Sequence, residues 1–183
     1  MAYTFDEPKL GLLQIAATDA GVTSPSGVSS GSTTTIPTPP NVLGMVVRAF
    51  DPTYGEGEFI LLKGVASTAV GSLVVWDGTT YVTTLCPTTT LTGRPVAISM
   101  TANTSATVFS WYQIGGTAVA AKSTSSNFAA TVALGVKSTG KVGANASGVQ
   151  ILGARTANTA TVASATTTVQ VVLDRPHLMG RIT

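Results

Sequence analysis

The sequence predicts an all-β protein, an antiparallel β-sandwich or small barrel of roughly nine short strands with an extended N-terminal arm. Two observations lead to this prediction. From residue 44 onward, short runs rich in β-branched residues alternate with turn residues. No long stretch shows the apolar periodicity of an amphipathic helix. The length of 183 residues allows one domain with a sizeable core plus an extension. We therefore divide the chain into an arm and linker, residues 1–43, and a β-domain, residues 44–183.

The N-terminal segment differs in composition from the rest of the chain. Residues 22–40 are a low-complexity run of Ser, Thr, Gly and Pro, which cannot bury enough apolar surface to offset the entropy lost on ordering. We interpret this run as a linker or as an arm that becomes ordered on a partner; a tail without a role is the alternative. Apolar residues in and before the run are candidate partner contacts. They are Leu10, Leu12, Leu13, Ile15 and Ile36.

The segment 48–64 concentrates charge, aromatic residues and turn residues in a chain otherwise poor in charge. Asp51-Pro52 is typical of a turn start, because proline fixes φ and the aspartate can accept hydrogen bonds from nearby amides. The run 59–62 is apolar without alternation, which indicates a strand covered on both faces. We predict a strand, an ordered loop and a buried strand. Two loop residues are further candidate partner contacts, Tyr54 and Glu56.

The middle of the chain contains the clearest strand signals. The runs 73–76 and 81–85 flank Asp77-Gly78, a strong hairpin signal. In the run 96–100 larger apolar residues alternate with Ala and Ser, which predicts a half-buried strand. Strands at 108–114 and 117–121 are separated by a glycine pair that fits either a tight turn or a bulge.

The C-terminal third continues the strand pattern. A turn is predicted at Ser138-Thr139-Gly140. Val169, Val171 and Leu173 should share one face of the last strand, and Pro176 should end it. The predicted strands of this third cover residues 130–136, 141–143, 149–152 and 167–173.

Charge is scarce and unevenly distributed. Charged residues make up 10% of the chain, against about 25% in typical soluble domains. A surface of Thr, Ser, Ala and Gly is cheap to desolvate, which favours a component of an assembly. Up to Asp77 the chain has three bases and seven acids; after it there are seven bases and one acid. This asymmetry is compatible with complementary charge between subunits or toward an acidic surface, but scattered solvated strand ends explain it more simply.

Two classes of partner are not expected. The bases form no cluster interleaved with aromatic residues, which argues against nucleic-acid binding. No apolar run approaches the length of a membrane span, and the N-terminus lacks the basic region of a signal peptide. We therefore predict neither a nucleic-acid partner nor a membrane partner.

The residues that carry enzyme chemistry are few. Cys86 is the only cysteine, so no intrachain disulfide can form, and we interpret it as a small buried thiol. The only histidine, His177, has no candidate partner nearby in sequence and is predicted to be a surface or interface residue. Asp51, Glu56 and Glu58 could serve as calcium ligands or as glycosidase acids, but a strand connection explains them without chemistry. We predict no catalytic residue, no metal site, no cofactor and no enzymatic activity.

Four aromatic residues lie on or beside predicted strands, namely Trp76, Tyr81, Trp111 and Tyr112. Exposed together, they would form a platform for stacking sugars. Aromatic residues on sandwich strands are more often core residues or interface anchors, which is the interpretation we favour.

Two stretches carry a resemblance to a known family. RAFDPTYGEGEFILLKG at residues 48–64 and WYQIGGTAV at 111–119 resemble the small all-β capsid decoration (cement) proteins of tailed bacteriophages. The likeness is good over residues 44–119, whereas the Ala/Thr-rich C-terminal third is similar only in its general composition. It rests on scaffold residues and indicates a kind of protein, not a catalytic site.

The resemblance implies a virion structural protein that binds the outer surface of the phage head and stabilises the lattice of the major capsid protein. Such a protein is made in the host cytoplasm and ends on the exterior of the capsid. The family implies self-association, a homotrimer before a dimer, and an arm at residues 1–40 that interlocks with the capsid or with neighbouring copies. The alternative function is a phage-surface carbohydrate-binding or adhesin module.

Overall fold

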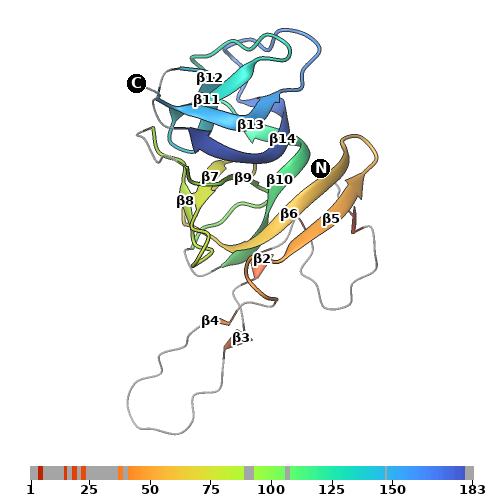
Figure 1. Ribbon diagram of the computed structural model, residues 1–183, viewed down its shortest axis with the longest axis vertical. Helices are drawn as coiled ribbons and strands as arrows, with labels where there is room; N and C mark the ends of the chain where they lie inside the picture. The colour runs from red at the N-terminus through yellow and green to blue at the C-terminus, as the bar shows by residue number, and fades with distance from the viewer. Residues whose placement is uncertain are drawn as a thin grey trace, which may run out of the picture.

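The protein is an antiparallel β structure, and the all-β prediction is confirmed (Figure 1). Twelve strands form one sheet that curls into a half-barrel, and β3 and β4 form a separate pair. The computed structural model describes residues 4–5, 15, 18–19, 22–23, 37–38, 41–88, 93–105, 108–146 and 148–179. The strands are β1 (Thr4–Phe5), β2 (Thr18–Asp19), β3 (Val22–Thr23), β4 (Pro37–Thr38), β5 (Val46–Asp51), β6 (Gly55–Lys63), β7 (Leu73–Trp76), β8 (Thr83–Leu85), β9 (Val96–Ser99), β10 (Phe109–Ala121), β11 (Ala133–Ser138), β12 (Lys141–Ala144), β13 (Gln150–Thr156) and β14 (Thr168–Met179).

The longest strand, β10, is the centre of the sheet. Along one edge it pairs with β6. Along the other edge it pairs in turn with β2, β9 and β14. Beyond β6 lies β5, and beyond β14 lie β13, β11 and β12. Strands from both halves of the chain therefore meet on β10, as Figure 1 shows.

The β5–β6 hairpin has a shorter loop than predicted. β6 begins at Gly55, so Gly57 lies in the strand and not in the loop. A Cβ on Gly57 would lie 3.0 Å from both the Phe59 ring and the Gln113 amide, so glycine is needed there for close packing. The turn itself forms as predicted, because Asp51 Oδ1 accepts hydrogen bonds from the backbone N–H groups of the next residues. All four residues at 59–62 are buried, which confirms the strand covered on both faces.

The β7–β8 hairpin is also confirmed. Trp76 pairs with Thr83 across it. Asp77 Oδ1 accepts hydrogen bonds from the backbone N–H groups of Thr79 and Thr80, both at 2.9 Å. The bond from Thr80 is the largest of the effects that lower the pKa of the Asp77 carboxyl. Asp77 therefore shapes the turn through its side chain.

The prediction of a half-buried strand at 96–100 is wrong. All four residues of β9 are buried. Val96 and Ile98 pack into one apolar cluster, whereas Ala97 packs into another on the opposite face. An alternation of larger apolar residues with small ones indicates only that one face of a strand is covered. The curled sheet covers both faces of β9.

Bulges in β10 and β14 determine the outcome of two further predictions, the glycine pair and the end of the last strand. β10 runs through the glycine pair without turning, and its register with β6 shifts between Gln113 and Gly115, so a bulge lies at Ile114-Gly115 and the pair is not a turn. β14 does not end at Pro176 but continues to Met179. The proline follows a bend at Arg175, whose φ is 41°, within a bulge of β14, where residues 174–176 lie opposite the single residue Gly153 of β13. A proline is tolerated at such an irregularity because the ladder hydrogen bond is already interrupted.

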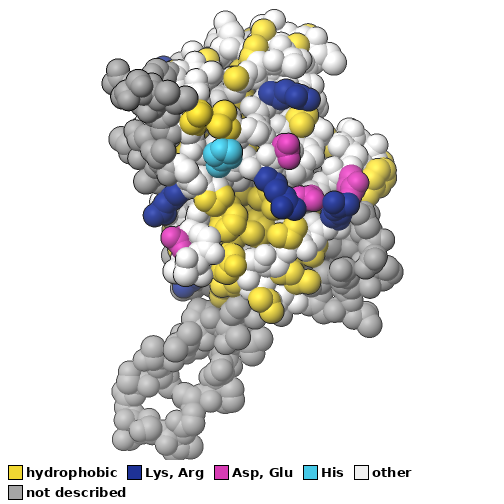
Figure 2. Space-filling view, viewed as in Figure 1, with side chains coloured by type: hydrophobic (Ala, Val, Ile, Leu, Met, Phe, Trp, Pro, Cys, Tyr) yellow, Lys and Arg dark blue, Asp and Glu magenta, His cyan; other side chains and the backbone are white. Residues whose placement is uncertain are grey.

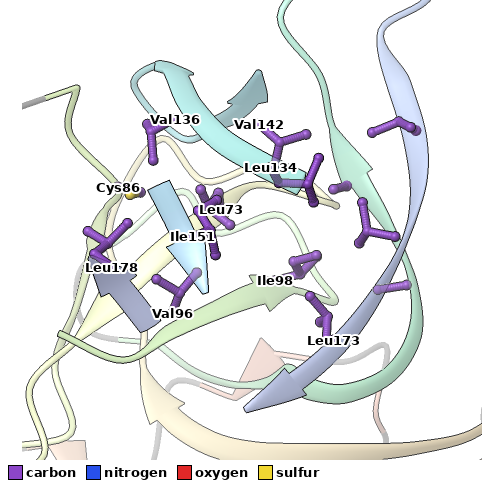
Figure 3. Packing of buried hydrophobic residues seen from close by; sticks show 14 of the residues in the cluster. Leu73, Cys86, Val96, Ile98, Leu134, Val136, Val142, Ile151, Leu173 and Leu178 are labelled. Atoms are coloured by element: carbon purple, nitrogen blue, oxygen red, sulfur yellow. The ribbon is translucent and has the colours of Figure 1, made fainter. Parts of the chain in front are cut away.

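Three apolar clusters form the core. The largest fills the space between β7, β9 and the strands β10–β14, and its side chains point toward one another (Figure 3). Val169, Val171 and Leu173 share the face of β14 that packs there, as predicted. The second and third clusters lie on opposite faces of β6 and β10, with Trp111 in the second and Tyr112 in the third.

Parts of the predicted N-terminal arm belong to the sheet. Thr4–Phe5 pairs with β5, and Thr18–Asp19 pairs with β10. Ile15 is only 3% exposed and packs in the second cluster. Strands β1 and β2 and the side chain of Ile15 thus belong to the β-domain, whereas β3 and β4 pair only with each other.

Candidate functional site

A network of charged side chains lies on one face of the sheet. On β5, Arg48 stands opposite Glu58 of β6. Arg48 contacts Glu56 and Glu58, with N–O distances of 3.3 Å to each. Glu58 Oε2 also accepts a hydrogen bond from Arg175 Nε of β14 at 3.2 Å. Glu58 therefore joins the β5–β6 hairpin to the bend in β14.

The glycine pair of β10 makes this junction possible. β10 lies between β6 and β14, and Gly115 pairs with Glu58 on one side and with Asp174 on the other. Because Gly115 and Gly116 have no side chains, the Glu58 side chain crosses the β10 backbone to reach Arg175. A Cβ on Gly115 would lie 3.1 Å from the Glu58 Cβ. The result is an open cleft of about 310 Å³ with a backbone floor and charged walls.

The charges continue beyond this cleft. Asp174 lines it and also lines a second hollow of about 250 Å³ together with Arg155 of β13. Figure 2 shows basic and acidic side chains alternating across this face, beside a patch of apolar side chains. We call this set the charge band. It consists of Arg155 on β13, Asp174 and Arg175 on β14, Glu56 and Glu58 on β6, and Arg48 on β5.

The ion pairs of the charge band lie at the surface of the sheet. Its Arg48 and Arg175 side chains are 63% and 71% accessible to solvent, whereas that of Glu58 between them is 21% exposed. Exposed pairs of this kind contribute about 0–1 kcal/mol each to stability. Its guanidinium and carboxylate groups retain room for further hydrogen bonds, which is what a polar interface offers to a partner.

The structure places the predicted carboxylate constellation in two environments. Asp51 is 3% exposed, and its carboxylate accepts hydrogen bonds from the amides of its own loop. Glu56 and Glu58 lie on β6 in the charge band. Within the described ranges, no three His, Cys, Asp or Glu side chains are grouped to hold a metal ion.

Large apolar side chains are exposed on several separate elements. Val46 and Phe50 share with Arg48 the outward-facing side of β5 and are 45% and 50% exposed. Phe50 pairs with Glu56, at one end of the charge band. Among the residues that the structure describes, the exposed large apolar ones are Val42, Val46, Phe50, Val70, Val82 and Leu152.

The predicted partner contacts are found in different places. Tyr54 is half-buried at the tip of the β5–β6 hairpin, and Glu56 is exposed beside it. Ile15 is buried in the second cluster, so its side chain serves the core of this chain. The remaining four candidates lie outside the residues that the structure describes. They are Leu10, Leu12, Leu13 and Ile36.

The four aromatic residues do not form one platform. Trp111 and Tyr112 are fully buried on opposite faces of β10, as core residues. Trp76 and Tyr81 are half-buried and stack on each other, with ring centroids 6.0 Å apart. The favoured interpretation as core residues therefore holds for Trp111 and Tyr112.

Two buried polar groups were not recognised from the sequence. Asn103 Nδ2 donates to the Tyr112 hydroxyl at 2.8 Å and to Ser110 Oγ at 3.2 Å. Burial raises the pKa of the Tyr112 phenol. Lys122 is fully buried, and its ammonium donates to three backbone carbonyls. Two of the Lys122 acceptors, the carbonyls of Ser164 and Thr166, lie more than 40 residues away in the chain, so no local sequence pattern identifies them.

Cys86 is buried, as predicted, and burial raises the pKa of its thiol to about 12. At pH 8 we expect the thiol of the folded protein to stay protonated and not to react with a disulfide reagent such as DTNB, because the thiolate is the nucleophile. In denaturant, one thiol per chain should react within minutes. Rapid labelling of the native protein at pH 8 would contradict this.

The side chain of His177 is exposed on β14.

No helix of the described part of the chain is long and apolar enough to cross a membrane. The chain was also compared with known proteins. No family model, curated protein or solved structure matches it.

Proposed function

We propose that this chain is a virion structural protein, a capsid decoration protein that binds the outer surface of a phage head and stabilises the lattice of the major capsid protein. The observation that supports this proposal most directly is the character of the exterior. It has few charges, and large apolar side chains stand exposed on separate strands and loops. Such a surface can be covered by a partner at low desolvation cost.

The fold suits adhesion at several points. A curled sheet whose strands meet on β10 holds its loops and hairpins in fixed positions. Fully burying a valine or phenylalanine side chain contributes about 1.5–3 kcal/mol, so a few half-exposed residues such as Phe50 and Val70 supply useful binding energy. On a capsid the same contacts repeat by symmetry, so each contact can be modest.

The β5–β6 hairpin is the contact element we propose. It carries Val46 and Phe50 on its exposed side, with Tyr54 at its tip and Glu56 beside Phe50. Aromatic and apolar residues at the centre of a protein interface, surrounded by polar ones, supply most of its binding energy. The hairpin combines both kinds of residue within one short segment.

The proposal is tested by adding the purified protein to phage heads that lack it. We expect saturable binding at symmetry-related positions in a cryo-EM map, and heads that withstand higher temperature once decorated. Phe50→Asp should lower the affinity for heads about tenfold or more, because it places a charge in an apolar contact. Gln170→Asp, at another exposed position, should bind like the unmodified chain.

Failure of the folded protein to bind heads would overturn the proposal. Binding to a glycan array with no binding to heads would instead support the adhesin alternative. Equal affinity of the Phe50→Asp variant would exclude the hairpin as the contact element while leaving attachment by another surface.

A further inference from the structure

Another hollow lies beside β11 and β12, far along the sheet from the charge band. Its volume is about 470 Å³, and sites for small molecules typically measure about 300–1,000 Å³. The segment that precedes β11, β11 itself and the connection from β12 to β13 line it. In the sheet order these strands lie beyond β14, on the other side of β10 from the β5–β6 hairpin (Figure 1). The hollow is therefore separate from the proposed capsid contact.

A β-bulge places a cationic side chain at this hollow. Neighbouring residues of a regular strand point to opposite faces, yet Val136 and Lys137 both line the hollow. The register of β11 with β12 shifts between Val136 and Ser138, so Lys137 is the extra residue of a bulge. On β12, a Cβ on Gly143 would clash with the Cβ of Lys137. The bulge and the glycine together give the Lys137 side chain its direction and its room.

Neutral polar groups surround the cation. Ser126 is only 6% exposed although it lines the hollow, whereas Lys137 and Asn145 are exposed at its edge. With the other residues that the structure describes, the side chains of these three residues form no hydrogen bond. Their donors and acceptors are therefore available to a ligand. The neutral polar residues of the lining are Thr88, Ser125, Ser126, Asn127 and Asn145.

The composition of the lining selects the class of ligand. None of the described residues that line the hollow is acidic, so a cationic or zwitterionic ligand would find no partner for its positive group. A single lysine without arginine suits one anionic group better than a chain of phosphates. Hydroxyls and amides both donate and accept, which matches the adjacent hydroxyls of a sugar. Val136 and the half-buried Val149 add apolar surface for the C–H groups of a sugar ring.

We propose that this hollow binds a saccharide that carries a carboxylate, such as a uronic acid or sialic acid residue. The ammonium of Lys137 pairs with the carboxylate, and the side chains of Ser126 and Asn145 bind ring hydroxyls. This site goes beyond the proposed function and does not rest on it. A chain attached to a head through the β5–β6 hairpin leaves the hollow uncovered by that contact.

The test uses the purified full-length chain, labelled with ¹⁵N, in the absence of phage heads. Glucuronate, galacturonate and N-acetylneuraminate are each titrated to about 50 mM, with glucose as the control for the ring and acetate as the control for the charge. At least one sugar acid should shift the amide signals of residues 125–127 and 144–146 saturably, with a Kd of about 1–10 mM. Glucose and acetate should bind at least about fivefold more weakly, because each lacks one half of the recognised group.

Three outcomes of this titration would overturn the proposal. They are no saturable shift with any of the three sugar acids, an equal affinity for acetate, and an equal affinity for glucose. Equal binding of acetate would leave a site for any anion, and equal binding of glucose would remove the role of the ammonium.

Two substitutions test the roles of the lining residues. Lys137→Met removes the cation and should raise the Kd of the sugar acid about tenfold. Ser126→Ala removes one hydroxyl and should raise it about threefold. Lys141→Met removes an exposed lysine of β12 that does not line the hollow, so this control should bind like the unmodified chain.

The variants also separate this site from a diffuse attraction to positive charge. An unchanged Kd for Lys137→Met, or the same loss for Lys141→Met as for Lys137→Met, would overturn the proposal. Circular dichroism and thermal melting of each variant show whether lost binding reflects lost folding. Binding to heads is measured separately, so the saccharide site can fail while the proposed function stands, and the reverse.

Discussion

Replacing Lys122 by Met should lower the free energy of unfolding by about 3 kcal/mol. The ammonium is fully buried and donates to the carbonyls of Ser123, Ser164 and Thr166 at 3.0–3.1 Å. Its three N–H groups match the three acceptors one for one. Methionine fills similar space but has no donor, so the buried carbonyl of Ser123 and the partly buried carbonyls of Ser164 and Thr166 lose their partner. Urea denaturation followed by Trp fluorescence measures the difference.

The same substitution on the surface is the control. Lys137 is exposed on β11, so Lys137→Met should change the free energy of unfolding by less than about 0.5 kcal/mol. Burial lowers the pKa of the Lys122 amine, which shows that desolvation opposes the charged form. If the Lys122→Met variant were as stable as the unmodified chain, desolvation would cancel the three hydrogen bonds. That outcome would contradict the prediction.

The sequence predicted those elements whose causes are local. The β7–β8 hairpin forms because Asp77 accepts hydrogen bonds from the amides that follow it. The turn between β11 and β12 forms at Thr139-Gly140, where glycine adopts a φ of 70°. The apolar run 59–62 is buried on both faces, as its lack of alternation indicated. In each case the information lies within a few residues.

The features that the sequence did not predict depend on distant partners. The alternating sequence of β9 predicts a half-buried strand, because alternation cannot show that the curled sheet covers the second face of that strand. The sequence predicts that β14 ends at Pro176, but a bulge of β14 opposite Gly153 of β13 accommodates the proline and lets the strand continue. Nothing near Pro176 in the chain shows what β13 will do.

The charge band was only partly foreseen. The sequence predicts Glu56 as a partner contact, whereas Glu58 enters only as a candidate calcium ligand or glycosidase acid. Their partner Arg175 lies 117 residues from Glu58 in the chain. The glycine pair at Gly115-Gly116 was recognised as a turn or a bulge, but not as the floor over which these side chains meet. Only the pairing of β10 with both β6 and β14 makes that role visible.

Gly116→Ala should destabilise the protein by about 3 kcal/mol, the second large effect we expect. The φ of Gly116 is 84°, a conformation that costs a residue with a Cβ about 1–2 kcal/mol. A Cβ there would also clash with the backbone oxygen of Glu56 and lie 2.9 Å from the Gly57 Cα. Since both obstacles are backbone atoms, β6 and β10 would have to separate, which weakens the pairing at the centre of the sheet.

Two other glycines separate these causes. Gly55 has a φ of 76° but open space around its Cα, so Gly55→Ala should cost only the conformational part, about 1 kcal/mol. Gly78 has neither the positive φ nor a close neighbour, so Gly78→Ala should be nearly neutral. Urea denaturation of the three variants at one protein concentration, which keeps any self-association constant, should rank them in this order. Equal losses for Gly116→Ala and Gly55→Ala would show that the approach of β6 to β10 is not tight, and the glycine floor of the charge band would lose its physical basis.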